Sequence, residues 1–199
     1  MLAAILGAGS EARILVVGAG GTAQEIVTMA PVEPDWRFTA VDPSAPMLDL
    51  AVAKLESVGL TDRVVVHLGT VQDLPVEEKF DAATCIGVLH HLPGLEAKQS
   101  LLRDISSRLK PGAPMVLAGN QMAYASQPVL LKAWGERWRM NGSSEDEVTA
   151  KLGRILEGAD PPSTPEALLE LFGEAGFVEP LQFFSSLFWG AWLVRKKAF

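Results

Sequence analysis

A glycine-rich turn near the start of the chain is the first feature that could bind a ligand. It reads Gly18-Ala19-Gly20-Gly21-Thr22-Ala23 and lies between a β-branched run and an amphipathic segment. Glycines let the backbone turn sharply and approach a ligand closely, and the amino terminus of the following helix faces that ligand. Asp42 ends the next apolar run, where a carboxylate is suited to accepting hydrogen bonds from ribose hydroxyls. Together these features indicate a site for a nucleotide-containing cofactor.

The same features leave other interpretations open. The glycine run fits the pattern G-x-G-x-x-A, and an acid about 20 residues later completes the fingerprint of an oxidoreductase that uses NAD(P) or a flavin. A tight turn alone explains the glycines without any ligand, and a helix cap explains Asp42 in the same way. Other segments of the chain are needed to decide between these readings.

Two adjacent histidines, His90 and His91, follow the fourth apolar run. Either could act as a general base, because an imidazole titrates near neutral pH. The alternative is that one caps the loop and the other packs against the residues that follow. A metal site with Asp73 is disfavoured, since adjacent histidines splay apart and their spacing matches no metal signature. Cys85 is either a wall of the cofactor site or a small buried hydrophobe. We do not expect it to act as a nucleophile, because nothing in the sequence positions a base or cation beside it to activate the thiol.

Aromatic residues cluster in the second half of the chain. Trp134 and Trp138 stand one helical turn apart with Arg139 beside them, and Tyr124 lies upstream. These four residues could form a lid over an apolar or anionic substrate, or the tryptophans could simply anchor the segment to the domain. The aromatic tail 183–192 is predicted to be core or the face of a homodimer.

Composition limits the classes of partner. The chain has 199 residues with a formal net charge of −7, which predicts one domain and argues against a nucleic-acid partner. A single cysteine rules out a disulfide framework. No apolar run reaches the roughly 20 residues needed to span a bilayer, and the run 2–6 is too short for a signal peptide. We therefore expect a cytoplasmic protein with no membrane partner.

The apolar pattern predicts an α/β fold. Strands are expected at 13–17, 37–41, 63–68, 80–86 and 114–119, with helices at 22–29, 45–58 and 95–109 between them. The alternation then breaks into two helices at 124–140 and 144–158, a helix at 166–175, and two apolar runs at 176–183 and 188–195. We expect one domain, 1–199, with a helical insert at about 121–162 placed at the carboxyl edge of the sheet, where ligands bind in such folds.

Five segments together resemble the class I S-adenosylmethionine-dependent methyltransferases. They are the glycine turn, the run 41–48, the run 67–75, the run 80–93 and the turn 109–113, and the resemblance covers about residues 12–119. It implies a Rossmann-like, three-layer αβα sandwich with strand order 3-2-1-4-5-7-6 and strand 7 antiparallel. The C-terminal part more loosely resembles the branch that contains carboxy-S-adenosylmethionine synthase. No arginine occurs in 145–152 to pair with an extra carboxylate, so S-adenosylmethionine is the expected cofactor.

The resemblance also implies roles for particular residues. The glycine turn would hold the methionine part of the cofactor. Asp42, at the end of the second strand, would bind the ribose, and Asp73, in the run 67–75, would bind the adenine amino group. The end of the fourth strand would form the floor near the methyl group. The cofactor positions are Gly18, Ala19, Gly20, Asp42, Pro43, Met47, Gln72, Asp73, Cys85 and Ile86. The family's loop usually reads Gly-x-Gly-Thr/Ser-Gly, whereas here Gly21 precedes Thr22.

The resemblance predicts methyl transfer from S-adenosylmethionine to a small molecule. Because the cofactor is already activated, the protein must mainly supply proximity, orientation and a dry site. The alternatives are the oxidoreductase, a protein that binds S-adenosylmethionine without catalysis, and a tRNA-modifying enzyme. Few residues precede the first strand, so we expect the insert, or a second subunit, to close the site.

Overall fold

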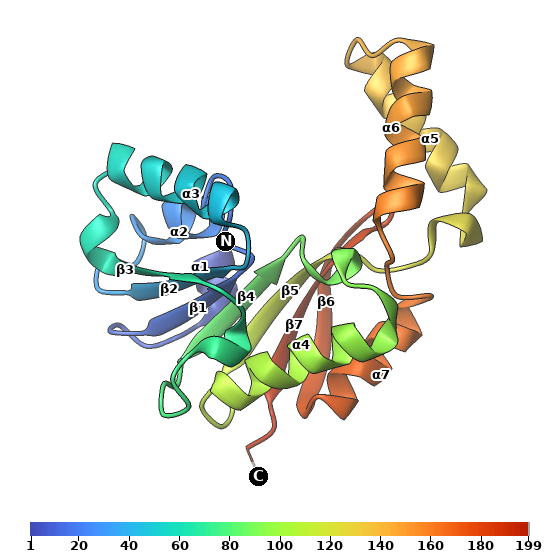
Figure 1. Cartoon of the computed structure of the whole chain (residues 1–199). Coiled ribbons are helices and arrows are strands. Elements are labelled where there is room, and N and C mark those ends of the chain that lie inside the picture. Colours follow the sequence, from blue (N-terminus) through green and yellow to red (C-terminus); the bar gives the residue numbers. More distant parts are fainter. Residues whose placement is uncertain (199) are drawn as a thin grey trace.

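Seven strands form a single sheet in residues 1–198, the part of the chain that the computed structural model describes. The strands are β1 (Arg13–Val17), β2 (Arg37–Asp42), β3 (Val64–Leu68), β4 (Ala82–Ile86), β5 (Pro114–Asn120), β6 (Phe177–Ser186) and β7 (Trp189–Lys196). Their order is β3-β2-β1-β4-β5-β7-β6, with β1 to β5 parallel and β7 antiparallel to both of its neighbours. The predicted fold class, strand order and direction of strand 7 are confirmed (Figure 1).

The helices also lie close to their predicted bounds. They are α1 (Leu2–Leu6), α2 (Gln24–Met29), α3 (Ala45–Ser57), α4 (Gly94–Arg108), α5 (Pro128–Met140), α6 (Glu145–Gly158) and α7 (Pro165–Glu174). Short 3₁₀ turns occupy Thr61–Arg63 (η1), Val71–Asp73 (η2), Leu89–His91 (η3) and Tyr124–Ser126 (η4). The helix predicted from residue 124 therefore starts later, because Pro128 is favoured in the first turn of a helix and disfavours helical backbone in the residue before it. Helix α1 is not predicted by the sequence pattern.

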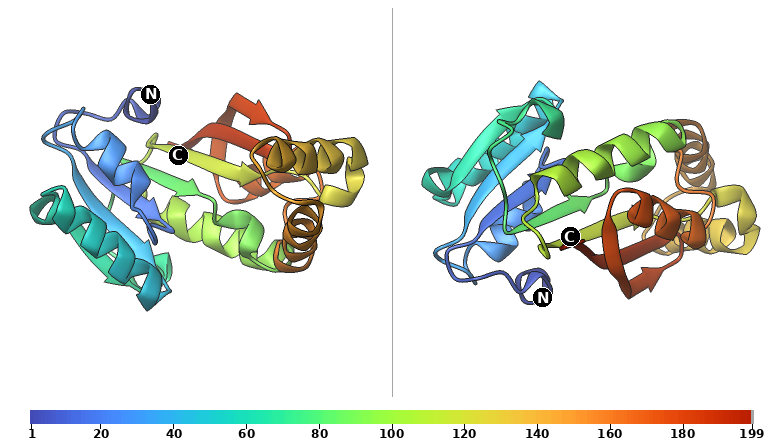
Figure 2. Two further views of the ribbon diagram at one scale, coloured as in Figure 1. Left: turned by 90° about the horizontal axis from the view of Figure 1, so that it is seen from above. Right: turned by 90° about the horizontal axis from the view of Figure 1, so that it is seen from below.

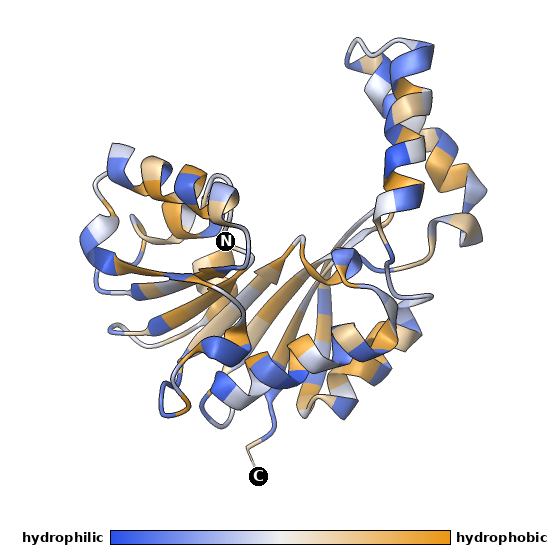
Figure 3. Ribbon diagram, viewed as in Figure 1, coloured by the Kyte–Doolittle hydropathy of each residue, from blue (hydrophilic) through white to orange (hydrophobic). Residues whose placement is uncertain are grey.

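Side chains alternate across the sheet and build a core on each face. On β1, Leu15 and Val17 join the cluster that contains α4 and α7, while Ile14 and Val16 join the cluster that contains α1, α2 and α3. Strands β1, β2, β4 and β5 are mostly buried, so they read as continuous apolar runs, as parallel strands covered on both faces do. The edge strands β3 and β6 are more exposed. Figure 3 shows this as hydrophobic colour along the central strands and alternating colour along the helices.

Helices α5 and α6 form the insert between β5 and α7. They pack against each other and extend beyond the carboxyl end of the sheet (Figures 1 and 2). Helix α6 starts with a capping box, in which the Glu147 amide donates to Ser144 Oγ at 3.2 Å and the Ser144 amide donates to Glu147 Oε2 at 2.8 Å. None of the helices in 1–198 has the length and apolarity that crossing a bilayer requires.

Candidate functional site

A cavity of about 510 Å³ lies at the carboxyl ends of β1, β2 and β4. This is the switch point of the sheet, where the strand order reverses between β1 and β4, and ligands of open α/β sheets bind there. Its volume lies within the usual range for small-molecule sites. The residues predicted from the sequence that line it are Gly18, Gly20, Asp42, Pro43, Met47, Ile86 and His91.

The turn after β1 needs glycine at two positions for different reasons. Gly18 has a φ of +75°, and a Cβ there would overlap the side chain of Val88. A Cβ on Gly20 would stand 2.6 Å from Asp42 Oδ2 and 2.5 Å from Met47 Cβ. The turn therefore passes directly against the end of β2, which places the glycine backbone and the carboxylate on the same wall of the cavity.

Asp42 is held in place by backbone donors on both of its oxygens. The Gly20 amide donates to Oδ2 at 3.0 Å, and the Ser44 amide donates to Oδ1 at 2.9 Å. A carboxylate has about four lone-pair sites, so each oxygen can still accept another hydrogen bond from the cavity side. The half-buried carboxylate is thus oriented in advance for a ligand that carries two hydroxyl groups.

The segment after β3 lines the cavity with other residues than the two that were predicted. Gly69, Thr70 and Val71 line the cavity, whereas Gln72 and Asp73 are not among its lining residues. Asp73 Oδ2 accepts hydrogen bonds from the Thr70 amide at 2.7 Å and from Thr70 Oγ1 at 2.8 Å, which caps η2. These bonds from Thr70 hold the pKa of the Asp73 carboxyl below its usual value.

Ala19 and Cys85 lie behind the cavity instead of on its surface. Both are buried, and Cys85 belongs to the core cluster beneath α4. Burial, with a smaller effect of the Glu25 charge, raises the pKa of the Cys85 thiol to about 12. The thiol is therefore protonated at neutral pH and is not a nucleophile.

A second hollow of about 360 Å³ adjoins the first and shares part of its wall. Both are lined by Gly18, Gly20, Ile86 and Gly87. The second hollow adds Glu25 of α2 and Trp189 of β7, which the sequence analysis did not predict as site residues. The apolar pattern of the aromatic tail predicts core or a dimer face there. Phe188 and Trp192 are indeed buried, whereas Trp189 is only half-buried and faces the site.

A third hollow, of about 290 Å³, lies at the base of the insert. Its aromatic walls are Tyr124, Trp134 and Trp189, and both histidines line it as well. His91 also lines the first cavity, so the two spaces meet at this residue. Helix α6 adds the exposed Arg154 at its edge.

Two of the residues predicted to bind substrate do not line this hollow. Trp138 packs against Trp134 with ring centroids 5.3 Å apart, and the Lys151 ammonium lies 5.7 Å from its ring centroid. Arg139 forms an ion pair with Glu136 of its own helix. Helix α5 leads away from the sheet (Figure 1), and Trp134 is the residue of this helix that lines the hollow. That the insert covers a bound substrate stays a prediction.

The two histidines occupy different environments. His90 is buried, with ring centroids 4.3 Å from His91 and 5.8 Å from Trp189, and its Nδ1 has no hydrogen-bond partner in the described part of the chain. Burial, followed by the charges of His91 and Lys98, lowers the pKa of His90 to about 4. His90 is therefore neutral and weakly basic at pH 7, whereas His91 is exposed to the cavity.

The buried His90 predicts a dependence of stability on pH. The unfolded chain binds a proton on this residue below about pH 6.5, and the folded chain does so only below about pH 4. The free energy of unfolding should therefore fall as the pH is lowered from 6.5 to 4. In a His90→Asn variant this fall should be smaller by on the order of 2 kcal/mol. Urea unfolding of both proteins at several pH values measures the difference, and equal slopes would contradict it.

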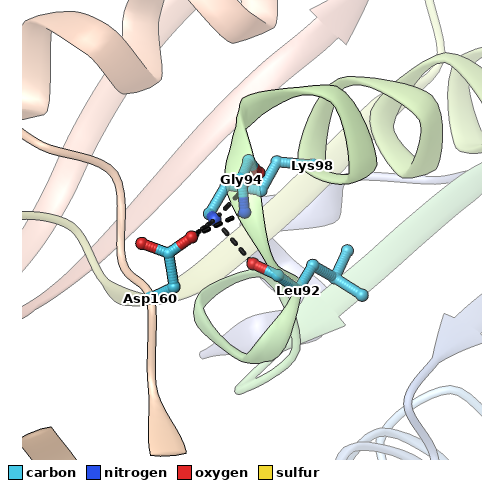
Figure 4. A network of polar contacts seen from close by, with 4 residues as sticks. All are labelled: Leu92, Gly94, Lys98 and Asp160. Carbon is cyan, nitrogen blue, oxygen red and sulfur yellow. Dashed lines mark hydrogen bonds and ion pairs between the residues drawn. The ribbon is translucent and has the colours of Figure 1, made fainter. Parts of the chain in front are cut away.

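A buried lysine fixes the loop that carries the histidines. Lys98 of α4 donates from Nζ to the Leu92 carbonyl at 2.6 Å, to the Gly94 carbonyl at 3.0 Å and to Asp160 Oδ2 at 2.9 Å (Figure 4). Asp160 follows the insert, and its amide donates to the His90 carbonyl at 2.7 Å. The end of the insert is thereby joined to the loop after β4, where the first cavity and the third hollow meet.

Among residues 1–198, no group of three or more histidine, cysteine, aspartate and glutamate side chains is arranged to hold a metal ion. The homodimer predicted from the aromatic tail stays a prediction. The role of each predicted site residue also stays a prediction.

Comparison with known proteins identifies the family. The pattern of the methyltransferase domain matches residues 15–115, just over half of the chain. The ubiquinone biosynthesis O-methyltransferase of Xanthomonas campestris pv. campestris (strain B100) is 36% identical over 109 residues, which cover 54% of this chain and 42% of that protein. The carboxy-S-adenosyl-L-methionine synthase of Desulforapulum autotrophicum is 27% identical over 142 residues, which cover 70% and 56%. The chain thus spans about half the length of these curated relatives.

Solved structures agree on the fold. Human N-acetylserotonin methyltransferase, in complex with SAM, superposes with a TM-score of 0.66 at 17% identity, covering 94% of this chain and 48% of that chain. At this identity the likeness concerns the fold alone. Together with the match over residues 15–115 and the strand order of the sheet, it shows that this chain belongs to the class I S-adenosylmethionine-dependent methyltransferases.

Proposed function

We propose that this chain transfers the methyl group of S-adenosylmethionine to a hydroxyl group of a small molecule. The observation that carries the proposal is that the three hollows adjoin one another, because each pair of them shares lining residues. The first two share the glycine turn and the end of β4, and the third meets them at His91 and Trp189. A cofactor and an acceptor can therefore lie side by side at one edge of the sheet.

The first cavity fits the nucleoside part of the cofactor. Asp42 would accept hydrogen bonds from the ribose hydroxyls, since both of its oxygens are oriented and keep free lone pairs. Met47 and Val71, from the segments after β2 and β3, would contact the adenine ring. The apolar wall formed by Val88, Leu92 and Leu101 would exclude water from that ring.

When bound, S-adenosylmethionine supplies an activated methyl group, and the chain has to align the acceptor with it. Proximity and orientation are the main contributions that a protein makes to such a displacement. The third hollow would hold the acceptor between Tyr124, Trp134 and Trp189, whose rings favour a planar molecule. The Tyr124 hydroxyl is fixed by a 2.6 Å hydrogen bond from Asn120 Nδ2, which makes the wall rigid.

His91 is the residue we assign to proton removal from the acceptor hydroxyl. It lies where the cofactor cavity and the acceptor hollow meet, and an exposed imidazole can accept a proton. His90 is less suited to this role because burial keeps it neutral down to about pH 4. The names of the relatives, which include an O-methyltransferase, support a hydroxyl acceptor.

Calorimetry with the whole chain tests the proposal at the cofactor. S-Adenosylhomocysteine, the product of methyl transfer, should give a saturable binding heat, and NAD should give none. Saturable binding of NAD alone would favour the oxidoreductase instead. Binding of S-adenosylhomocysteine without methylation of any hydroxylated aromatic compound in a panel would favour a protein that binds the cofactor without catalysis.

A further inference from the structure

The second hollow contains one carboxylate and no cation. Glu25 is the only ionisable side chain among its lining residues, which are otherwise glycines, apolar side chains and the uncharged Thr22, Gln24 and Thr28. The Thr28 hydroxyl already donates to the backbone carbonyls of Gln24 and Glu25. Glu25 belongs to none of the ion pairs found within residues 1–198. Within the described residues, no cationic side chain therefore pairs with this carboxylate, and a backbone hydrogen bond at Glu25 offsets only part of the effect of burial.

Leaving such a charge half-buried has an energetic cost. Removing a carboxylate from water without a partner disfavours its ionised form, and burial accordingly raises the pKa of Glu25 above its usual value. A cation bound beside it would offset that cost. The hollow therefore favours a positively charged group over a neutral or negative one.

The position of Glu25 indicates which cation this is. Asp42 lines the first cavity, and the hollow of Glu25 adjoins that cavity at Gly18 and Gly20, which line both. A nucleoside whose ribose is held by Asp42 would extend its 5′ substituent past these glycines. In S-adenosylmethionine that substituent is an amino-acid arm, which ends in an ammonium group and a carboxylate.

We propose that Glu25 binds the ammonium group of this amino-acid arm and so positions the methionine end of the cofactor. The inference rests on the proposed function, because it assumes that the nucleoside occupies the first cavity. Glu25 would act as a positioning residue, since it contacts neither the methyl group nor the acceptor. A cationic methyl acceptor in the same hollow is the alternative occupant.

Two ligands that differ only in this arm separate the possibilities. S-Adenosylhomocysteine has the arm, whereas 5′-methylthioadenosine has the same adenine, ribose and thioether without it. Calorimetry should show that Glu25→Gln weakens binding of S-adenosylhomocysteine about tenfold, as expected for loss of a charge-assisted hydrogen bond. Binding of 5′-methylthioadenosine should stay within about twofold of the wild-type value, because its contacts are untouched.

Glu56→Gln is the matched control, since it makes the same chemical change at an exposed site near the end of α3. It should leave both affinities unchanged. Equal weakening of both ligands by Glu25→Gln would indicate a structural role and overturn the inference. Unchanged binding of S-adenosylhomocysteine would overturn it as well and favour the cationic acceptor. If the wild-type chain binds neither nucleoside, it is the proposed function itself that fails.

Discussion

Replacing Asp42 with alanine should weaken the binding of S-adenosylhomocysteine about 100-fold, as measured by calorimetry. The variant loses the acceptors for the ribose hydroxyls. It also loses the two bonds that the carboxylate accepts from the Gly20 and Ser44 amides, so the glycine turn is no longer tied to the end of β2. Both losses act on the same cavity, which is why we expect a larger effect than one hydrogen bond would give.

Asp42→Asn should have an intermediate effect, because the amide keeps one acceptor oxygen and loses the charge. Asp62→Ala removes a carboxylate from an exposed turn on the same half of the molecule and should leave the affinity unchanged. If the alanine variant at position 42 bound as tightly as the wild type, Asp42 would not be the ribose ligand.

Replacing Lys98 with methionine should lower the free energy of unfolding by about 2–4 kcal/mol. The side chain is 1% exposed, and its ammonium is the partner of the Leu92 and Gly94 carbonyls and of Asp160. Methionine has a similar length but cannot donate a hydrogen bond, so these groups lose their bonds to the ammonium. Urea denaturation of both proteins measures this loss, and the m-value should stay unchanged.

Lys110→Met provides the comparison for this change. Lys110 forms an ion pair with Asp81 at 2.6 Å, but its side chain is 52% exposed. Exposed pairs contribute little, so this variant should lose less than about 1 kcal/mol. Similar losses in the two variants would mean that the network between α4 and the end of the insert does not stabilise the fold.

Much of the fold follows from local sequence pattern. The runs that form β1 to β5 are short, apolar and separated by helical segments, and this alternation restricts the chain to a parallel sheet with helices on both faces. Ser144 marks the start of α6, and glycines mark where several strands end, so the residues themselves indicate these element boundaries. The start of α5 differs because the pattern alone does not reveal that residues 124–126 form a separate turn before Pro128.

The site was predictable where it is built from strand ends. Gly18 directly follows β1 and Asp42 is the last residue of β2, and the carboxyl ends of parallel strands meet at one edge of the sheet. Glu25 and Trp189 carry no comparable signal. Each stands in an ordinary amphipathic or apolar segment, and only the packing of α2 against the sheet and the pairing of β7 within it bring these side chains to the hollow.

The amino-acid sequence by itself determined the class of fold, the glycine turn and the acid that faces it, because these depend on backbone conformation and strand order within short stretches. Tertiary structure alone decided which of two adjacent histidines is buried, and it placed Trp134 of α5 at the third hollow while leaving Trp138 and Arg139 outside it. Those outcomes depend on contacts between segments far apart in the chain. No local pattern of residues encodes the face that each segment presents.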